Sequence, residues 1–120
     1  MKKYRVLVNN DIVAFNVTLA DTFVSRLVGL LKHKKLEDGE GLLINRCKQV
    51  HTFGMKFSID ALFLSRDGEI LHIEDDIRPG RVSRHIKKAH QVLELKAGTV
   101  KENNIKPHNS VTFEVIQFRA

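Results

Sequence analysis

The alternation of apolar and polar residues near the start of the chain predicts a β-hairpin. Over residues 13–20 the two kinds of residue alternate with a period of two, which is typical of a strand with one buried face. The residues expected on the buried face are Val13, Phe15, Val17 and Leu19. Asn9, Asn10 and Asp11 precede this run and suit a tight turn, so a second strand is expected before them.

The period changes over residues 21–35, which predict the one main helix. Phe23, Leu27, Leu30 and Leu31 fall on a single helical stripe, and Asp21 is suited to cap the first turn.

The rest of the chain predicts further short strands and one brief helical turn. Strands are expected over residues 42–47, 59–65, 69–75, 90–96 and 110–118, and a short helix or turn over 98–104. Arg66, Asp67 and Gly68 form a turn between two of these runs, which favours antiparallel pairing. We expect an α+β, mainly β fold, in which one main helix packs on a strongly curved antiparallel sheet or small barrel of six to seven strands, in a single domain over residues 1–120.

Composition limits the class of protein. The chain of 120 residues is 42% hydrophobic and 28% charged, which is ordinary for a globular domain. It contains no apolar run long enough to cross a bilayer, its first residues lack the apolar region of a signal peptide, and its single cysteine cannot form an internal disulfide. These observations predict a cytoplasmic protein with no membrane association.

The charge is strongly basic, with a formal net value of +6 and a pI of about 9.7. Much of the excess lies in two clusters, residues 32–35 and 78–88. Such clusters attract nucleic acid, but neither has aromatic residues interleaved for base stacking, so a solvated basic rim is the simpler interpretation.

Asp60 is the residue that most needs a chemical explanation. It shares a strand face with Leu62 and Leu64, where a carboxylate must be paired, hydrogen-bonded or protonated. Arg26, His51 or the backbone amides of residues 51–55 could serve as its partner. Glu94 either faces the same polar region or points outward from its strand.

Cys47 and His51 raise the question of a metal or thiol centre. Their C-x-x-x-H spacing supplies two ligand types for zinc or copper, but no further ligand follows at a typical spacing, and no oxyanion hole is recognisable. Met55 suits adaptable packing better than metal ligation. We therefore expect no metal, no cofactor and no catalytic residue.

Four stretches in this order carry a family resemblance: "ADTFVSRLVGLL" from Ala20, "HTFGMKFSIDALFLS" from His51, "RPGR" from Arg78 and "VLELKAG" from Val92. Together they resemble the prokaryotic family known as domain of unknown function 192. The positions that match its pattern are Arg26, Gly29, His51, Thr52, Met55, Asp60 and Glu94. Ser58 stands where the family usually has proline, and Leu31 where a methionine is frequent. The resemblance implies a compact, mainly β domain and names no reaction.

The leading hypothesis is a noncatalytic β domain that binds a small ligand or protein partner. Its tentative binding residues are His51, Thr52, Met55, Asp60, Arg26 and Glu94. The alternative is a nucleic-acid-associated or regulatory protein that uses the clusters at 32–35 and 78–88. An enzyme with a Cys47–His51 metal or thiol centre is less favoured.

Overall fold

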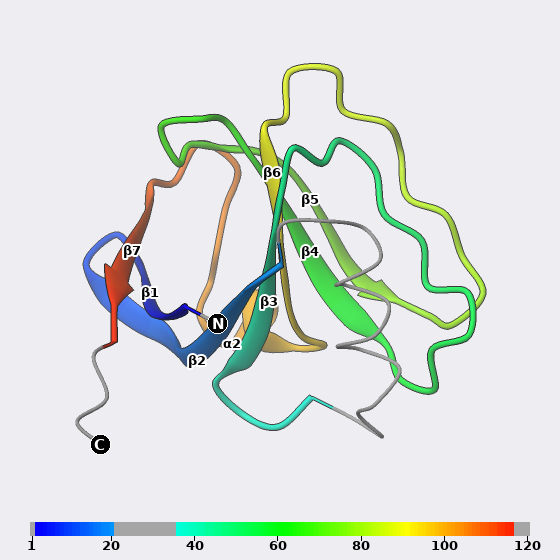
Figure 1. The fold of residues 1–120 in the computed structure, drawn as a ribbon, viewed down its shortest axis with the longest axis horizontal. Coiled ribbons are helices and arrows are strands. Elements are labelled where there is room, and N and C mark those ends of the chain that lie inside the picture. Colours follow the sequence, from blue (N-terminus) through cyan, green and yellow to red (C-terminus); the bar gives the residue numbers. More distant parts are fainter. Residues whose placement is uncertain (1, 21–35, 117–120) are drawn as a thin grey trace.

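Seven β-strands form one curled sheet in the computed structural model, which describes residues 2–20 and 36–116 (Figure 1). The strands are β1 (Lys3–Val8), β2 (Asp11–Ala20), β3 (Glu40–Asn45), β4 (Ile59–Leu64), β5 (Ile70–Ile77), β6 (Gln91–Lys96) and β7 (Val111–Val115). A single turn of helix, α2 (Thr99–Glu102), precedes β7. The prediction of a mainly β, strongly curved sheet is confirmed. The main helix predicted over residues 21–35, with Arg26, Gly29, Leu31 and the cluster 32–35, lies outside the described residues.

The sheet order is β5-β4-β6-β3-β2-β1-β7. Every neighbouring pair is antiparallel except β2 and β3, which run parallel. A parallel pair needs a long crossover connection, which residues 21–39 provide, so the wholly antiparallel sheet expected from the hairpin turns is wrong at this one pair.

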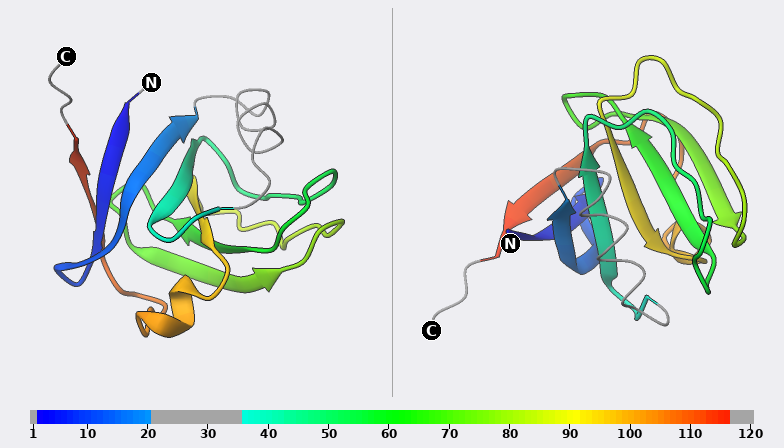
Figure 2. Two further views of the ribbon diagram at one scale, coloured as in Figure 1. Left: turned by 90° about the horizontal axis from the view of Figure 1, so that it is seen from below. Right: turned by 45° about the vertical axis from the view of Figure 1, so that its right-hand side comes forward.

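The two edge strands meet at their first residues. The Ile70 N–H donates to the carbonyl of Asn109 at 3.0 Å, and the Val111 N–H donates to the carbonyl of Gly68 at 2.8 Å. Glu69 and Ser110 form an isolated β-bridge beside these bonds. The sheet therefore curls into a half-barrel whose edges are joined at one end (Figure 2).

Both faces of the sheet are buried at β4. Along β4, Leu62 and Leu64 enter the core inside the curl, whereas Ile59, Ala61 and Phe63 enter a second core on the outer face. Residues from the segments 47–57 and 86–89 complete that outer core. The alternation predicted for residues 59–64 is confirmed, and it explains why this strand has no exposed residue.

Strand β2 departs from the predicted period of two. Its pairing with β1 shifts register twice, between Tyr4 and Val6 and again between Val6 and Leu7. Such bulges change which residues face inward, so Ala14 and Val17 are buried while Phe15 is 58% exposed. The expected core position of Phe15 is wrong. Its ring instead lies over Gly39, in space that a side chain at Gly39 would occupy.

Candidate functional site

Asp60 is fully buried and is bound by three backbone amides. Its Oδ1 accepts a hydrogen bond from the Asp76 N–H at 2.8 Å. Its Oδ2 accepts from the N–H groups of Gly98 at 3.1 Å and Val100 at 2.9 Å. The partners are therefore backbone amides, as one alternative held, but they belong to β5 and the start of α2, and the expectation of His51 or residues 51–55 is wrong.

Opposed effects act on the pKa of the Asp60 carboxyl, and their net result is a raised pKa. Burial raises its pKa above the usual value and the negative charge of Asp75 adds to this, while the three amide donors oppose the rise. Two of the donors, Asp76 (φ 51°) and Gly98 (φ 99°), have left-handed backbone. For Asp76 that conformation costs roughly 1–2 kcal/mol, which the hydrogen bond to Asp60 offsets. Asp60 thus fixes the positions of β4, β5 and α2 relative to one another.

Thr52 joins two loops that are distant in sequence. Its buried hydroxyl donates to the carbonyl of Arg78 at 2.6 Å and accepts from the Arg81 N–H at 2.9 Å. Its own N–H donates to the carbonyl of Arg81 at 2.9 Å, and its carbonyl accepts from the Gly80 N–H at 3.0 Å. The stretches "HTFGM" and "RPGR" are therefore two halves of one structural unit.

The surface above Thr52 is partly apolar. The His51 ring stacks on Phe53 with centroids 5.0 Å apart, and His51 forms a β-bridge with Val82. Phe53 is 52% exposed and Val82 is 54% exposed, whereas Met55 is buried in the outer core. We call His51, Phe53, Arg78, Arg81 and Val82 the clamp surface.

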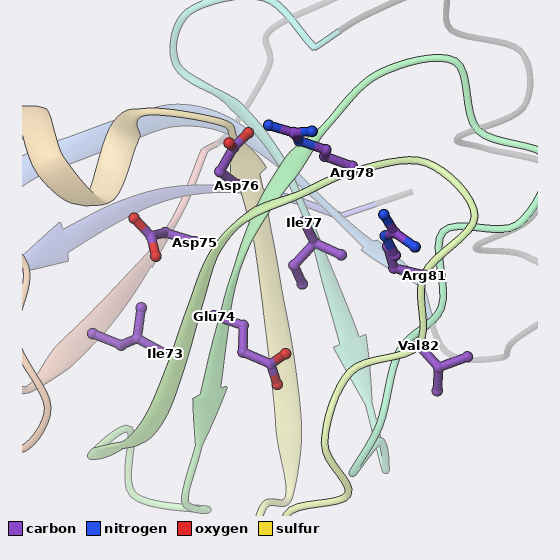
Figure 3. A pocket seen from close by; sticks show the side chains of 8 residues that line it. All are labelled: Ile73, Glu74, Asp75, Asp76, Ile77, Arg78, Arg81 and Val82. Carbon is purple, nitrogen blue, oxygen red and sulfur yellow. The ribbon is translucent and has the colours of Figure 1, made fainter.

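An open concavity of about 440 Å³ adjoins the clamp surface (Figure 3). It is lined by Ile73, Glu74, Asp75, Asp76 and Ile77 from β5 and by Arg78, Arg81 and Val82 from the loop that follows. The Glu74 carboxylate is oriented by the ring of His72 and by the Arg84 N–H, at 3.1 and 3.0 Å. Figure 3 shows Glu74 on the strand side of the hollow and Arg81 on the loop side, so the hollow carries charges of both signs, whereas the Asp75 side chain points to the other side of β5.

The predicted binding residues lie in three places. His51, Thr52 and Met55 belong to the loop that forms half of the clamp. Glu94 is buried on the outer face, where its register neighbours are Leu42 and Ala61. Asp60 pairs with Leu95 and faces the inner core, so Glu94 and Asp60 lie on opposite sides of the sheet and do not share a polar region. Arg26 lies outside the described residues.

Sequence reasoning missed the residues that line the concavity. Arg78 and Arg81 were expected as part of a basic rim, and nothing in the pattern paired them with Asp75 or Asp76. The positions of the two arginines on either side of a Pro-Gly turn are the one feature that could have indicated a shared surface.

Cys47 lies on a second concavity, of about 400 Å³, which does not include His51. Its thiol is hydrogen-bonded to the carbonyl of Gln49 at 3.2 Å. Within residues 2–20 and 36–116, no group of three or more His, Cys, Asp or Glu side chains is placed to hold a metal ion. No helix in the same part of the chain is long and apolar enough to cross a membrane.

Comparisons with known proteins point to one family and one fold. The model of the DUF192 family, described as "Uncharacterized ACR", matches residues 5–113. No curated protein matches the chain significantly. A crystal structure from Sinorhizobium meliloti 1021, named a "putative transcription regulator", is similar with 25% identity and a TM-score of 0.77, covering 93% of this chain and 92% of its own. A protein of unknown function from Novosphingobium aromaticivorans DSM 12444 is similar with 22% identity and a TM-score of 0.78, covering 90% of this chain and 83% of its own.

Proposed function

The chain belongs to the DUF192 family of uncharacterized proteins, and we propose that it acts as a noncatalytic binding domain through the clamp surface and the adjoining concavity. The ligand class that fits is a small peptide-like zwitterion, with a carboxylate, an amine and an apolar side chain. The observation that carries this proposal is the buried Thr52, which ties both loops of the clamp surface together with four hydrogen bonds to residues 78–81.

Rigidity of the clamp supports a binding role. A surface that is already ordered loses little conformational entropy when a ligand arrives, so more of the contact energy appears as affinity. Thr52 holds the two loops of the clamp surface in place, because it is fully buried beneath them and bonded to both Arg78 and Arg81. Phe53 and Val82 remain about half exposed above it and offer apolar contact.

The charges around the concavity support the ligand class. An arginine guanidinium presents a planar set of donors that matches a carboxylate, which Arg78 and Arg81 provide on the loop side. Glu74 on β5 would attract an amine and repel a polyanion. A ligand that carries both charges satisfies both sides of the hollow.

A titration followed by ¹⁵N–¹H NMR tests the proposal, with a panel of apolar dipeptides in free and N-acetylated forms as probes. We expect the free dipeptides to shift the amide signals of Thr52, Gly80 and Arg81, with weaker shifts for the acetylated forms. The variant Arg81→Ala should reduce the shifts at least fivefold, whereas the control Lys106→Ala, an exposed lysine elsewhere, should leave them unchanged. Absence of shifts in these loops for every probe, or equal shifts in both variants, would overturn the proposal.

The alternative role, association with nucleic acid through residues 32–35 and 78–88, is supported only in part of the second cluster. Arg78 and Arg81 adjoin the acidic side chains of β5, which weakens their attraction for a phosphate backbone. Within residues 84–88, the Arg84 N–H also contacts an acid, Glu74. Cluster 32–35 lies outside the described residues.

A further inference from the structure

Two segments far apart in the sequence, residues 45–50 and 83–90, lie side by side at one end of the sheet (Figure 1). The Ile86 N–H donates to the carbonyl of Lys48 at 2.9 Å, and the Ser83 N–H donates to the carbonyl of Val50 at 2.9 Å. The Val50 N–H in turn donates a hydrogen bond to the Ser83 hydroxyl oxygen at 2.9 Å. These bonds hold the two segments in a fixed arrangement.

The paired segments form a surface of one charge sign. Neither segment contains an aspartate or glutamate. Five exposed cationic side chains lie on them, and we call this set the basic platform: Arg46, Lys48, Arg84, Lys87 and Lys88. Against a formal net charge of +6 for the whole chain, this is a strong concentration of charge on a small part of the surface. The Glu74 carboxylate lies beside this surface, where it accepts a hydrogen bond from the Arg84 N–H at 3.0 Å.

The second concavity, of about 400 Å³, lies within this surface. Arg46, Lys48 and His85 line it, and no acidic residue lines it within the part of the chain that the structure describes. The Lys48 ammonium is anchored by the carbonyls of Lys87 and Ala89, each at 2.7 Å. An ammonium has three N–H donors, so these two bonds fix its position and leave one donor for a bound anion.

We propose that the basic platform binds the phosphate backbone of nucleic acid without reading the base sequence. Its two segments carry five exposed cations and no Asp or Glu, which matches a polyanion better than the clamp concavity with its carboxylates does. The two segments contain no Phe, Tyr or Trp, so they offer no platform for base stacking.

A lipid surface fits the basic platform less well. Membrane docking combines cations with exposed apolar groups that enter the bilayer. The large hydrophobic side chains exposed in the described part of the chain are Ile12, Phe15, Phe53, Val82 and Val115, and none of them belongs to the platform segments.

Fluorescence anisotropy with a labelled 20-base-pair DNA duplex tests the proposal. Contact with three to five phosphates gives a slope of log K against log salt of about −2.7 to −4.5, so affinity should fall roughly 40- to 500-fold between 50 and 200 mM NaCl. A duplex of unrelated sequence should bind with the same Kd within about twofold, because backbone contacts carry no sequence information.

Two charge-matched variants locate the binding surface. The double variant Lys87→Glu/Lys88→Glu should weaken binding at 50 mM NaCl at least tenfold, while its backbone carbonyl at position 87 still accepts from Lys48. The control Lys101→Glu/Lys106→Glu changes the net charge equally, in and after α2 and outside the two platform segments, and should bind within threefold of the unaltered protein. Circular dichroism melts establish that both variants fold.

Several results would overturn the proposal. Equal losses in the two double variants would show that net charge, not the platform, attracts DNA. Salt-independent or sequence-selective binding would refute backbone contact. Binding to a polyglutamate peptide or to vesicles with anionic lipids, without binding to DNA at 50 mM NaCl, would assign the platform to an acidic protein or a membrane instead.

Discussion

Replacing Asp60 with alanine should severely destabilise the fold. The substitution leaves the N–H groups of Asp76, Gly98 and Val100 without their acceptor; the bond from Val100 is buried, and those from Asp76 and Gly98 are partly buried. An unpaired donor costs about 1–3 kcal/mol where it is fully buried and less where water reaches it, so three would cost at most roughly 3–9 kcal/mol. Removing the carboxylate also removes its desolvation cost, so the expected loss is about 3–5 kcal/mol of the free energy of unfolding. A domain of this size has roughly 5–15 kcal/mol in total.

Urea unfolding at pH 7, followed by far-UV circular dichroism, measures this loss. Asp75→Ala is the matched control, because it removes a carboxylate from the same region whose side chain is 42% exposed, and it should change stability by no more than about 0.5 kcal/mol. If Asp60→Ala does not fold, Asp60→Asn keeps one acceptor oxygen and should lose about 1–3 kcal/mol. A loss below about 1 kcal/mol in Asp60→Ala would refute the assignment of Asp60 as the acceptor that joins β4, β5 and α2.

The pH dependence gives a second test of the same residue. Burial raises the folded-state pKa of Asp60 above its ordinary value of 3.8, so above that raised pKa the ionised carboxylate costs the folded state more than the unfolded chain. As the pH falls through the folded-state pKa, the folded protein takes up the proton first and gains stability, and the gain is complete below 3.8. The difference in free energy of unfolding between the unaltered protein and Asp60→Asn should therefore grow, in favour of the unaltered protein, as the pH falls from 7 to 4. A shrinking advantage would mean that the three amide donors outweigh burial.

Four further substitutions, in two matched pairs, test the loops. Thr52→Val removes the hydroxyl bonded to Arg81, so it should lower the free energy of unfolding by about 1–3 kcal/mol and speed hydrogen exchange of the Arg81 amide. Thr52→Ser keeps the hydroxyl and should preserve both the stability and the exchange rate. Unchanged exchange in Thr52→Val would contradict the role of Thr52 in joining the two loops. Gly68→Ala would place a Cβ 2.4 Å from the Val111 carbonyl oxygen at a φ of +92°, and should cost about 2–3 kcal/mol by urea unfolding. Gly80→Ala has a φ of +78° but nothing within 4 Å, and should cost only about 1 kcal/mol. Equal losses at the two glycines would show that the contact with Val111 is unimportant.

The sequence predicted the sheet well because local patterns determine strands. The period of two in residues 59–64 identified both faces of β4, and the turn at residues 66–68 identified the hairpin with β5. The bulges in β2 were not visible, because a bulge arises from pairing with β1 rather than from the composition of β2. Phe15 was misplaced for this reason.

The candidate site was less predictable, because its partners are set by register and by backbone. The pattern showed correctly that Asp60 needed a partner. Every residue except proline has a backbone N–H, so the sequence does not show which amides, 16 to 40 residues away, bind the Asp60 carboxylate. Because Ala61 pairs with Glu94, the side chains of Glu94 and Asp60 lie on opposite faces of the sheet. A register shift of one residue would have placed both side chains on the same face.

The pairing of β1 with β7 has a consequence for how the protein is made. Val8 pairs with Val111, so the strand synthesised first finds one of its two neighbours only when the last strand has left the ribosome. Contacts this far apart in sequence close late and slowly, and mainly β domains of such topology fold in milliseconds to seconds. Until β7 arrives, the nascent chain presents an unpaired strand edge at β1, which is the kind of edge that chaperones protect and that aggregation exploits.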